Sequence, residues 1–295
     1  MRATSIMSMP MEIITKSTEL ETAGFYWREL EGVRALVCAP LEDDGFINGF
    51  STRGGGVSPM PDQSLNLAGF NEDTADNILE NRRRFLKLFD GEWSLAGCWQ
   101  VHGADIRVVS ESGQAQQRPY ATGDDDRCDA LVSKLPQTLL GVKTADCVPV
   151  LMGDSQSGAF AAVHAGWRGT LASICVVTIE RLGDEYNVRP ENLRVAIGPA
   201  AGGCCYEVAA DVIDAFSARF DYSAELFTAT TPGHALIDLY KANQKQLISM
   251  GVNPERMHVS SLCTMCNNDS FFSYRREKSA QGKVGRLMAV IGKRG

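Results

Sequence analysis

Two residues of the types that bind metal ions, Cys147 and His164, flank a pair of short apolar runs. The runs cover residues 148–152 and 159–163, and a loop rich in Gly, Asp and Ser separates them. This pattern predicts a β-hairpin. If the turn is centred on Ser155 and Gln156, Cys147 lies directly opposite His164, and opposed residues have Cβ atoms about 4.5–5.5 Å apart. The hairpin therefore predicts half of a metal site, formed by a thiolate and an imidazole.

A catalytic zinc site needs a third protein ligand and keeps one position open. Among the other three histidines, His102 is favoured because a glycine follows it at the end of an expected strand, where functional loops begin. His234 and His258 remain alternatives. Two imidazoles and one thiolate also resemble a blue-copper site, but that site needs a weak axial ligand and Met152 is not obviously placed to supply it.

Charged residues near these segments predict an acid–base group and an anion site. Asp146 precedes the cysteine and is a candidate catalytic carboxylate, a support for the metal site or a turn residue. Arg168 follows the hairpin, where the chain turns into a helix whose N-terminal end favours anions. Arg53 precedes three glycines, which either cradle an anion or form an ordinary flexible turn. Arg275 and Arg276 follow an aromatic run expected to be a strand, which would point one arginine inward.

The remaining cysteines carry weaker signals. Cys263 and Cys266 form a CxxC pair, but a lone pair is weak evidence for structural zinc, so we expect buried free thiols. Cys204 and Cys205 are adjacent, and a bond between them would be strained, so we expect them to line or support a pocket. Nine cysteines in a long chain without a signal peptide indicate reduced thiols and a cytoplasmic protein.

The elements that must position these residues follow from periodicity and turn signals. Residues 1–24 are expected to be a loosely ordered lead-in, and residues 25–295 a single α/β domain with largely antiparallel or mixed sheets flanked by helices. Residues 112–126 are expected to form an exposed loop. Helices are predicted at 73–89, 171–182, 208–220 and 238–250. Strands are predicted at 34–39, 45–50, 95–101, 105–109, 129–135, 138–143, 193–199, 257–262, 271–274 and 286–291.

Composition limits the possible partners. The 295-residue chain is 44% hydrophobic, so it can bury a sizeable core. Its net charge of −7 and its lack of a dense basic stripe argue against a nucleic-acid surface. No apolar run is long enough to span a membrane. A small-molecule substrate is the expected partner.

Long motifs along the chain resemble the YfiH-like family, also called the laccase-domain or multicopper polyphenol oxidase family. In order, they are FSTRGGGVS, SLNL, QVHG, DALVS, TADCVPVLM, AAVHAGWRG, AIGPAAGGCCYEV, CTMC and FFSYRR. The resemblance runs from about residue 46 to residue 291. It implies one layered α/β domain similar to the catalytic fold of cytotoxic necrotizing factor, with Zn²⁺ held by His102, Cys147 and His164.

The resemblance also implies an enzyme that phosphorolyses adenosine, inosine, guanosine and methylthioadenosine and that deaminates adenosine. The catalytic candidates are then Asp146, Cys147 and Arg168. Candidates for binding substrate or phosphate are Arg53, Asn66, Arg168 and Arg275. Two other activities use the same residues. A peptidoglycan-precursor amidohydrolase would use Cys147 as a nucleophile with a histidine base. A polyphenol oxidase is less favoured, because four histidines are too few for a multicopper set.

Overall fold

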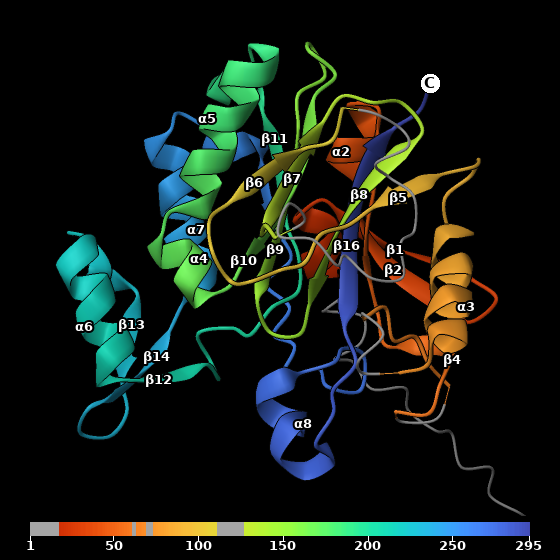
Figure 1. Ribbon diagram of the computed structural model, residues 1–295. Coiled ribbons are helices and arrows are strands. Elements are labelled where there is room, and N and C mark those ends of the chain that lie inside the picture. Colours follow the sequence, from red (N-terminus) through yellow and green to blue (C-terminus); the bar gives the residue numbers. More distant parts are fainter. Residues whose placement is uncertain (1–17, 61–62, 69–72, 111–126) are drawn as a thin grey trace, which may run out of the picture.

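The computed structural model describes residues 18–60, 63–68, 73–110 and 127–295 (Figure 1). The loop expected at 112–126 and most of the expected lead-in lie outside these ranges. Residues 18–22, which belong to that lead-in, are helical, and Leu20 is buried with side chains of the core.

Two six-stranded sheets form the centre of the fold. The first sheet has the order β1 (Phe25–Leu30), β2 (Val33–Cys38), β3 (Phe46–Ser51), β16 (Leu287–Lys293), β8 (Thr138–Thr144), β5 (Ser94–Ala96). The second has the order β15 (Met257–Val259), β11 (Arg194–Ile197), β9 (Val148–Gly153), β10 (Phe160–Ala165), β7 (Ala130–Ser133), β6 (Ile106–Val108). Most neighbours are antiparallel, and β5, β6 and β15 pair in parallel. A small third sheet contains β12 (Glu207–Ala209), β14 (His234–Ile237) and β13 (Phe227–Ala229).

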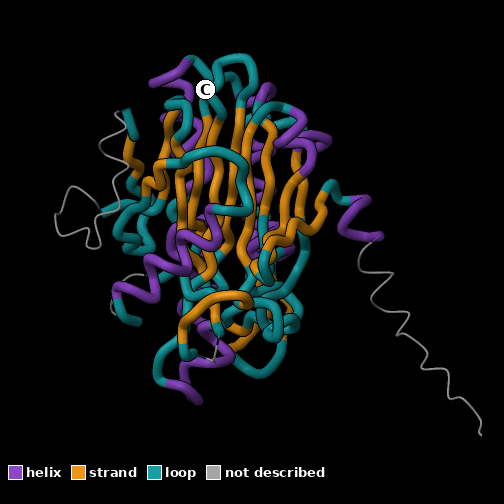
Figure 2. The backbone as a smooth tube through the Cα atoms, turned by 90° about the vertical axis from the view of Figure 1, so that its right-hand side faces the viewer, coloured by secondary structure: helices purple, strands orange, loops and turns teal. Residues whose placement is uncertain are grey.

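Helices cover the outer faces of the two large sheets, as the two views show (Figure 1, Figure 2). Helix α3 (Ala75–Leu86) packs on the first sheet, and α5 (Ile174–Tyr186) and α7 (Leu239–Ser249) pack on the second. The remaining helices are α2 (Ala39–Asp43), α4 (Trp167–Leu171), α6 (Ala210–Arg219) and α8 (Tyr274–Gln281). The predicted mixed α and β architecture is confirmed.

Alternation along the strands builds two cores from each sheet. In β16, Ala289 and Ile291 face the core between the sheets, whereas Met288 and Val290 face the core under α3. Strands buried on both faces have nearly continuous apolar sequences. This burial explains the two apolar runs of the hairpin, in which every residue of β9 and β10 is buried.

The prediction of a strand at 271–274 is wrong. Ser273 accepts a hydrogen bond from the backbone N–H of Arg276 and thereby caps the start of α8. Neither Arg275 nor Arg276 points into the core, because both are exposed on this helix. Instead, Glu277 is the residue of this segment that turns inward.

The glycine run is also different from either expectation, because it forms strand β4 (Gly54–Ser58). The backbone of residues 63–65 passes very close to this strand, and a Cβ on Gly56 would lie 2.1 Å from the carbonyl oxygen of Ser64. The backbone N–H of Gly56 donates to the carbonyl of Gln63 at 2.9 Å. The glycines therefore permit close backbone packing.

Two helices begin at positions other than the predicted ones. Thr74, and not the aspartate before it, caps α3 through the backbone N–H of Asn77. The helix expected at 171–182 begins earlier, as the short α4 after Gly166, breaks at Ser173 with φ of 60°, and continues as α5. Asp238 caps α7 as predicted. Within the described residues, no helix has the length and apolar character needed to cross a membrane.

Candidate metal centre

The hairpin of β9 and β10 forms with a register different from the predicted one. His164 lies opposite Pro149, two positions from the expected Cys147. The physical cause is the turn, in which the carboxylate of Asp154 accepts hydrogen bonds from the backbone N–H groups of Gln156 and Ser157. A shift by an even number keeps each side chain on its face. Cys147 and His164 are therefore diagonal neighbours on the face between the sheets.

His102, Cys147 and His164 come together at the end of this hairpin. Their potential ligand atoms all lie within 4.8 Å of one another. The two imidazole rings have centroids 4.9 Å apart and are nearly perpendicular. Gly166 leaves the space they need, because a Cβ there would lie 3.0 Å from Cys147 Sγ and 3.2 Å from His102 Cδ2. Two imidazoles and one thiolate match the ligand number and type of a catalytic zinc site.

The other two histidines lie in different surroundings. His234 is exposed at the start of β14, where its Nδ1 lies 3.4 Å from the carbonyl of Pro232. His258 is on β15 beside Arg194 and the carbonyl of Ala23. Neither belongs to the His102 group.

Asp129 holds the group in place, and the sequence analysis missed it. The register of β7 and β10 places Asp129 opposite His164, and its Oδ1 lies 2.8 Å from His164 Nδ1. Its carboxylate also accepts hydrogen bonds from the backbone N–H groups of Val101, His102 and Gly103 at 3.2, 2.9 and 2.6 Å. The buried carboxylate of Asp129 thus orients His164 through its ring and His102 through its backbone. The backbone of His102 is in the left-handed conformation, with φ of 63°. The sequence signal that could have indicated Asp129 is its position, because a carboxylate directly precedes the apolar segment that forms the buried strand β7.

The charges of the group reinforce one another. Burial alone would raise the pKa of Cys147, but the charge of His164 and hydrogen bonds from both imidazoles lower it to about 6. Burial would lower the pKa of His164, but the Cys147 thiolate and the Asp129 carboxylate raise it to about 9. Burial also opposes ionisation of Asp129, and the hydrogen bond and charge of His164 nevertheless lower its pKa. The site favours a thiolate ligand.

The carboxylate of Asp146 lies in a saturated hydrogen-bond network. Its Oδ1 accepts from Thr264 Oγ1 at 2.6 Å, and its Oδ2 accepts from Ser273 Oγ at 3.0 Å and from the backbone N–H of Arg275 at 2.7 Å. Asp146 has φ of 86°, a left-handed conformation. It lies in the short connection between β8 and β9, directly before Cys147. The residue fixes the start of α8 against the candidate site.

Two of the predicted anion-binding residues are engaged inside the fold. Arg53 is buried and forms a 2.5 Å ion pair with Glu277, and its NH1 donates to the carbonyl of Asn268 at 2.6 Å. A guanidinium neutralised in this way has little to offer a phosphate. Asn66 is fully buried, and its Oδ1 accepts from the backbone N–H groups of Ala68 and Arg286.

Arg168 and Arg275 are exposed near the candidate site. Arg168 stacks on the ring of Trp167 in α4, two residues after Gly166. Arg275 lies over the ring of Tyr206, with its guanidinium carbon 5.1 Å from the ring centroid. Burial and the nearby Cys147 charge raise the pKa of Tyr206, and Arg275 partly offsets this effect. A thiolate, a phenol and a guanidinium therefore share one environment.

We expect Asp129→Asn to weaken zinc binding by about 10- to 100-fold, the usual cost of losing a partner that orients a metal ligand. With Nδ1 of His164 bonded to Asp129, Nε2 is the nitrogen available to a metal. An amide N–H₂ facing Nδ1 would favour the opposite tautomer, in which Nε2 carries the proton and cannot bind a metal. Competition with a chromogenic zinc chelator measures the affinity. An unchanged affinity would contradict the orienting role, and Asp184→Asn, at an exposed position of α5, is the control.

Residues 47–294 match the sequence model of a family described as multi-copper polyphenol oxidoreductase laccase. The chain is 35% identical over 267 residues to purine nucleoside phosphorylase YlmD of Geobacillus stearothermophilus, which covers 88% of this chain and 94% of that protein. It is 37% identical over 243 residues to purine nucleoside phosphorylase YfiH of Escherichia coli (strain K12), with 82% and 91% covered. The crystal structure of YlmD from Geobacillus stearothermophilus aligns with a TM-score of 0.83 and 33% identity, covering 92% of this chain and 99% of that one. The residues matched by the family model include all three candidate ligands.

Proposed function

This chain belongs to the YfiH-like family of multi-copper polyphenol oxidoreductase laccase proteins, and from that premise we propose that it is a zinc-dependent purine nucleoside phosphorylase that also deaminates adenosine. The proposed substrates are adenosine, inosine, guanosine and methylthioadenosine, and the proposed catalytic domain comprises residues 25–295. The observation that carries the proposal is the group of His102, Cys147 and His164, oriented by Asp129. The names of the curated relatives support the reaction class.

The residues of the group fit a zinc ion. His102 and His164 supply imidazole nitrogens and Cys147 supplies a thiolate, so one position is left for substrate or water. A bound zinc would supply Lewis-acid chemistry, polarising an oxygen ligand. Copper is the less favoured metal, because a multicopper set needs many more histidines than the four in this chain.

The chain's own residues would position the other reactant. In phosphorolysis a phosphate oxygen forms a bond to C1′ of the ribose, and the departing purine takes the electron pair of the glycosidic bond. We assign phosphate binding to Arg168 and Arg275, the two predicted arginines that are exposed near the group. Tyr206, half-buried beside Arg275, forms an adjacent wall of the site.

Product analysis tests the proposed function directly. The zinc-loaded protein is incubated with adenosine in the presence and absence of inorganic phosphate. Phosphate-dependent formation of adenine and ribose 1-phosphate is the expected result, and inosine formed without phosphate reports deamination. If neither product appears with any of the four nucleosides, the proposal fails.

We expect Arg168→Ala to reduce phosphorolysis more than deamination, because only phosphorolysis requires a bound phosphate. A charge-assisted hydrogen bond is worth about 1.5–3 kcal/mol, so the KM for phosphate should rise about 10- to 100-fold. Initial rates at varied phosphate measure this change. The control is Arg189→Ala, which removes an exposed arginine paired only loosely with Glu191 at 3.6 Å. Equal loss of both activities in the Arg168 variant would argue against a phosphate role.

A second candidate is a thiol amidohydrolase acting on a peptidoglycan precursor. The observation that favours it is the chain of contacts from Asp129 to His164 to Cys147, with the pKa of the thiol lowered to about 6. A carboxylate, an imidazole and a thiolate in this order can form a nucleophilic triad without a metal. Zinc removal separates the two candidates, because a chelated protein that still cleaves an alanine- or serine-bearing precursor would support the amidohydrolase.

A further inference from the structure

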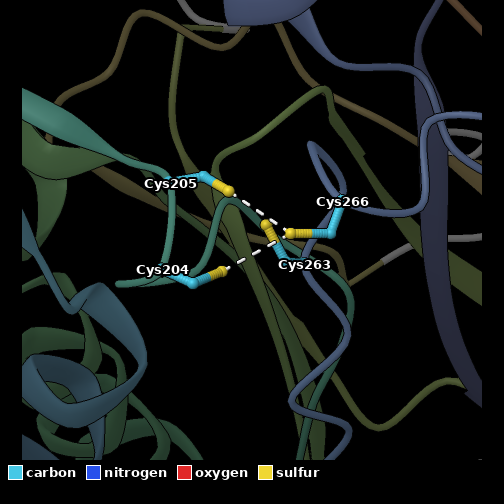
Figure 3. Close-up of side chains that lie close together, drawn as sticks. All are labelled: Cys204, Cys205, Cys263 and Cys266. Carbon is cyan, nitrogen blue, oxygen red and sulfur yellow. Dashed lines mark hydrogen bonds between the residues drawn. The ribbon is translucent and has the colours of Figure 1, made fainter.

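A second group of metal-binding side chains lies outside the candidate centre. The structure brings together Cys204, Cys205, Cys263 and Cys266, whose sulfur atoms all lie within 4.8 Å of one another (Figure 3). The expectation that the CxxC pair is isolated is therefore wrong, because the adjacent cysteines supply a second pair. The expectation of buried free thiols in the CxxC pair is also wrong for Cys266, which is exposed.

The spacing of the four sulfur atoms suits a single tetrahedral ion. A zinc–sulfur distance of 2.3 Å places the corners of a regular tetrahedron about 3.8 Å apart. The sulfur of Cys266 lies 3.6 Å from that of Cys204 and 3.3 Å from that of Cys205. These separations are far longer than the roughly 2.05 Å of a disulfide bond. The two printed sulfur–sulfur distances are slightly shorter than the tetrahedral value, and no sulfur–sulfur distance in the group exceeds 4.8 Å.

Two backbone turns point the four side chains toward one position. In the first turn, the carbonyl of Gly202 accepts from the backbone N–H groups of Cys205 and Tyr206, both at 3.0 Å. In the second turn, the carbonyl of Cys263 accepts from the backbone N–H of Asn267 at 3.0 Å. Gly202 must be small, because a Cβ there would lie 3.3 Å from both Cys204 Sγ and Cys263 Cβ. The two segments are joined beside the group by a bridge between Ala200 and Cys263. Adjacent cysteines can therefore face a common point without bonding to each other.

One of the four sulfur atoms also accepts a hydrogen bond from the backbone. The backbone N–H of Gly202 donates to Cys263 Sγ at 3.3 Å. Four thiolates in close contact need a cation to neutralise them. Four soft ligands with no position left for water are typical of structural zinc, and not of catalytic zinc.

We propose that Cys204, Cys205, Cys263 and Cys266 bind a second zinc ion, which has a structural role. This ion cross-links the loop before β12 to the loop before α8. Both loops form the wall of the candidate centre. Tyr206 follows the first pair directly, and Thr264, inside the second pair, donates to Asp146. The carbonyl of Met265 accepts from Arg276 of α8 at 3.2 Å. The ion therefore holds Tyr206 and the start of α8 in position relative to Cys147.

Zinc stoichiometry measured by mass spectrometry of the purified full-length chain tests this site independently of catalysis. We expect two zinc ions per chain in the wild type, one in Cys266→Ser and one in Cys147→Ala. The combined variant should bind none. The control Cys38→Ala removes a buried thiol outside both groups and should retain two. Equal zinc content in the wild type and in Cys266→Ser would overturn the four-thiolate site. Equal zinc content in the wild type and in Cys147→Ala would instead contradict the candidate centre, so the failures of the two sites can be told apart.

Cobalt substitution provides a readout that does not depend on a variant's stability. Cobalt added to zinc-stripped Cys147→Ala protein should give the intense visible absorption of tetrahedral thiolate coordination, and Cys204→Ser should reduce it strongly. The competing outcome is a disulfide. Thiol counting on the denatured, metal-stripped and unreduced protein should then find two fewer than nine thiols, and that result would overturn the proposal.

Discussion

Cys147→Ala is expected to lose the zinc proposed for the candidate centre and at least about 100-fold of the proposed nucleoside phosphorylase activity, more than the 10- to 100-fold cost of losing an orienting partner. The thiolate is one of only three ligands there, and it carries the charge that compensates the cation. Its loss leaves two imidazoles, which carry no negative charge, to hold a dication. Zinc content and the initial rate of ribose 1-phosphate formation measure the two effects on the same preparation.

A matched pair of variants distinguishes a metal ligand from a nucleophile. The control Cys175→Ala removes a buried thiol of α5, which lies outside the candidate centre and contacts Asn243. Zinc content and activity should be retained in this variant. His102→Ala should resemble Cys147→Ala if zinc is essential. In the thiol amidohydrolase, His164 and Asp129 form the base, so His102→Ala should have a much smaller effect. A zinc-free His102→Ala protein with near wild-type activity would therefore contradict the metalloenzyme.

The sequence predicted those parts of the candidate metal centre whose residues are placed by local patterns, such as the hairpin. The hairpin was evident because its apolar runs are buried on both faces, and its even register shift left the side chains on the predicted face. Asp129 was not evident, since its partnership with His164 depends on the pairing of β7 with β10. The four-cysteine group was missed for the same reason. Its two pairs lie about sixty residues apart, and a turn and a bridge bring them together.

The expectation of an inward-pointing arginine failed because a tertiary partner determined the local conformation. The aromatic run at 271–274 has a strand-like composition, but Ser273 and Asp146 together cap a helix there. Capping by a carboxylate from a distant segment leaves no local signal. The helix turned Glu277 inward and both adjacent arginines outward, and the buried carboxylate then paired with Arg53. One misassigned element thus placed Arg275 and Arg276 on the surface and paired Arg53 with a carboxylate for which the sequence predicted no role.

Glu277→Ala is expected to lower the free energy of unfolding by about 3–5 kcal/mol, the usual effect of removing one partner of a buried ion pair. Glu277 is 4% exposed, and its Oε1 accepts from both Arg53 and Asn268. Without it, the buried guanidinium keeps its charge and retains only neutral partners. Urea unfolding measures the change, which should appear as a lower midpoint with little change in slope.

Two comparisons make this expectation specific to burial. Glu80→Ala removes ion pairs with Arg83 and Arg84 on the surface of α3, where water screens the charges, so the loss of stability should be much smaller. The double variant Arg53→Met with Glu277→Leu removes both charges and should recover part of the loss, because no unpaired charge remains buried. If Glu277→Ala costs no more than Glu80→Ala, the buried pair is not what anchors α8. Because α8 also carries Arg275, that anchoring is the link between the stability of the core and the geometry of the candidate site.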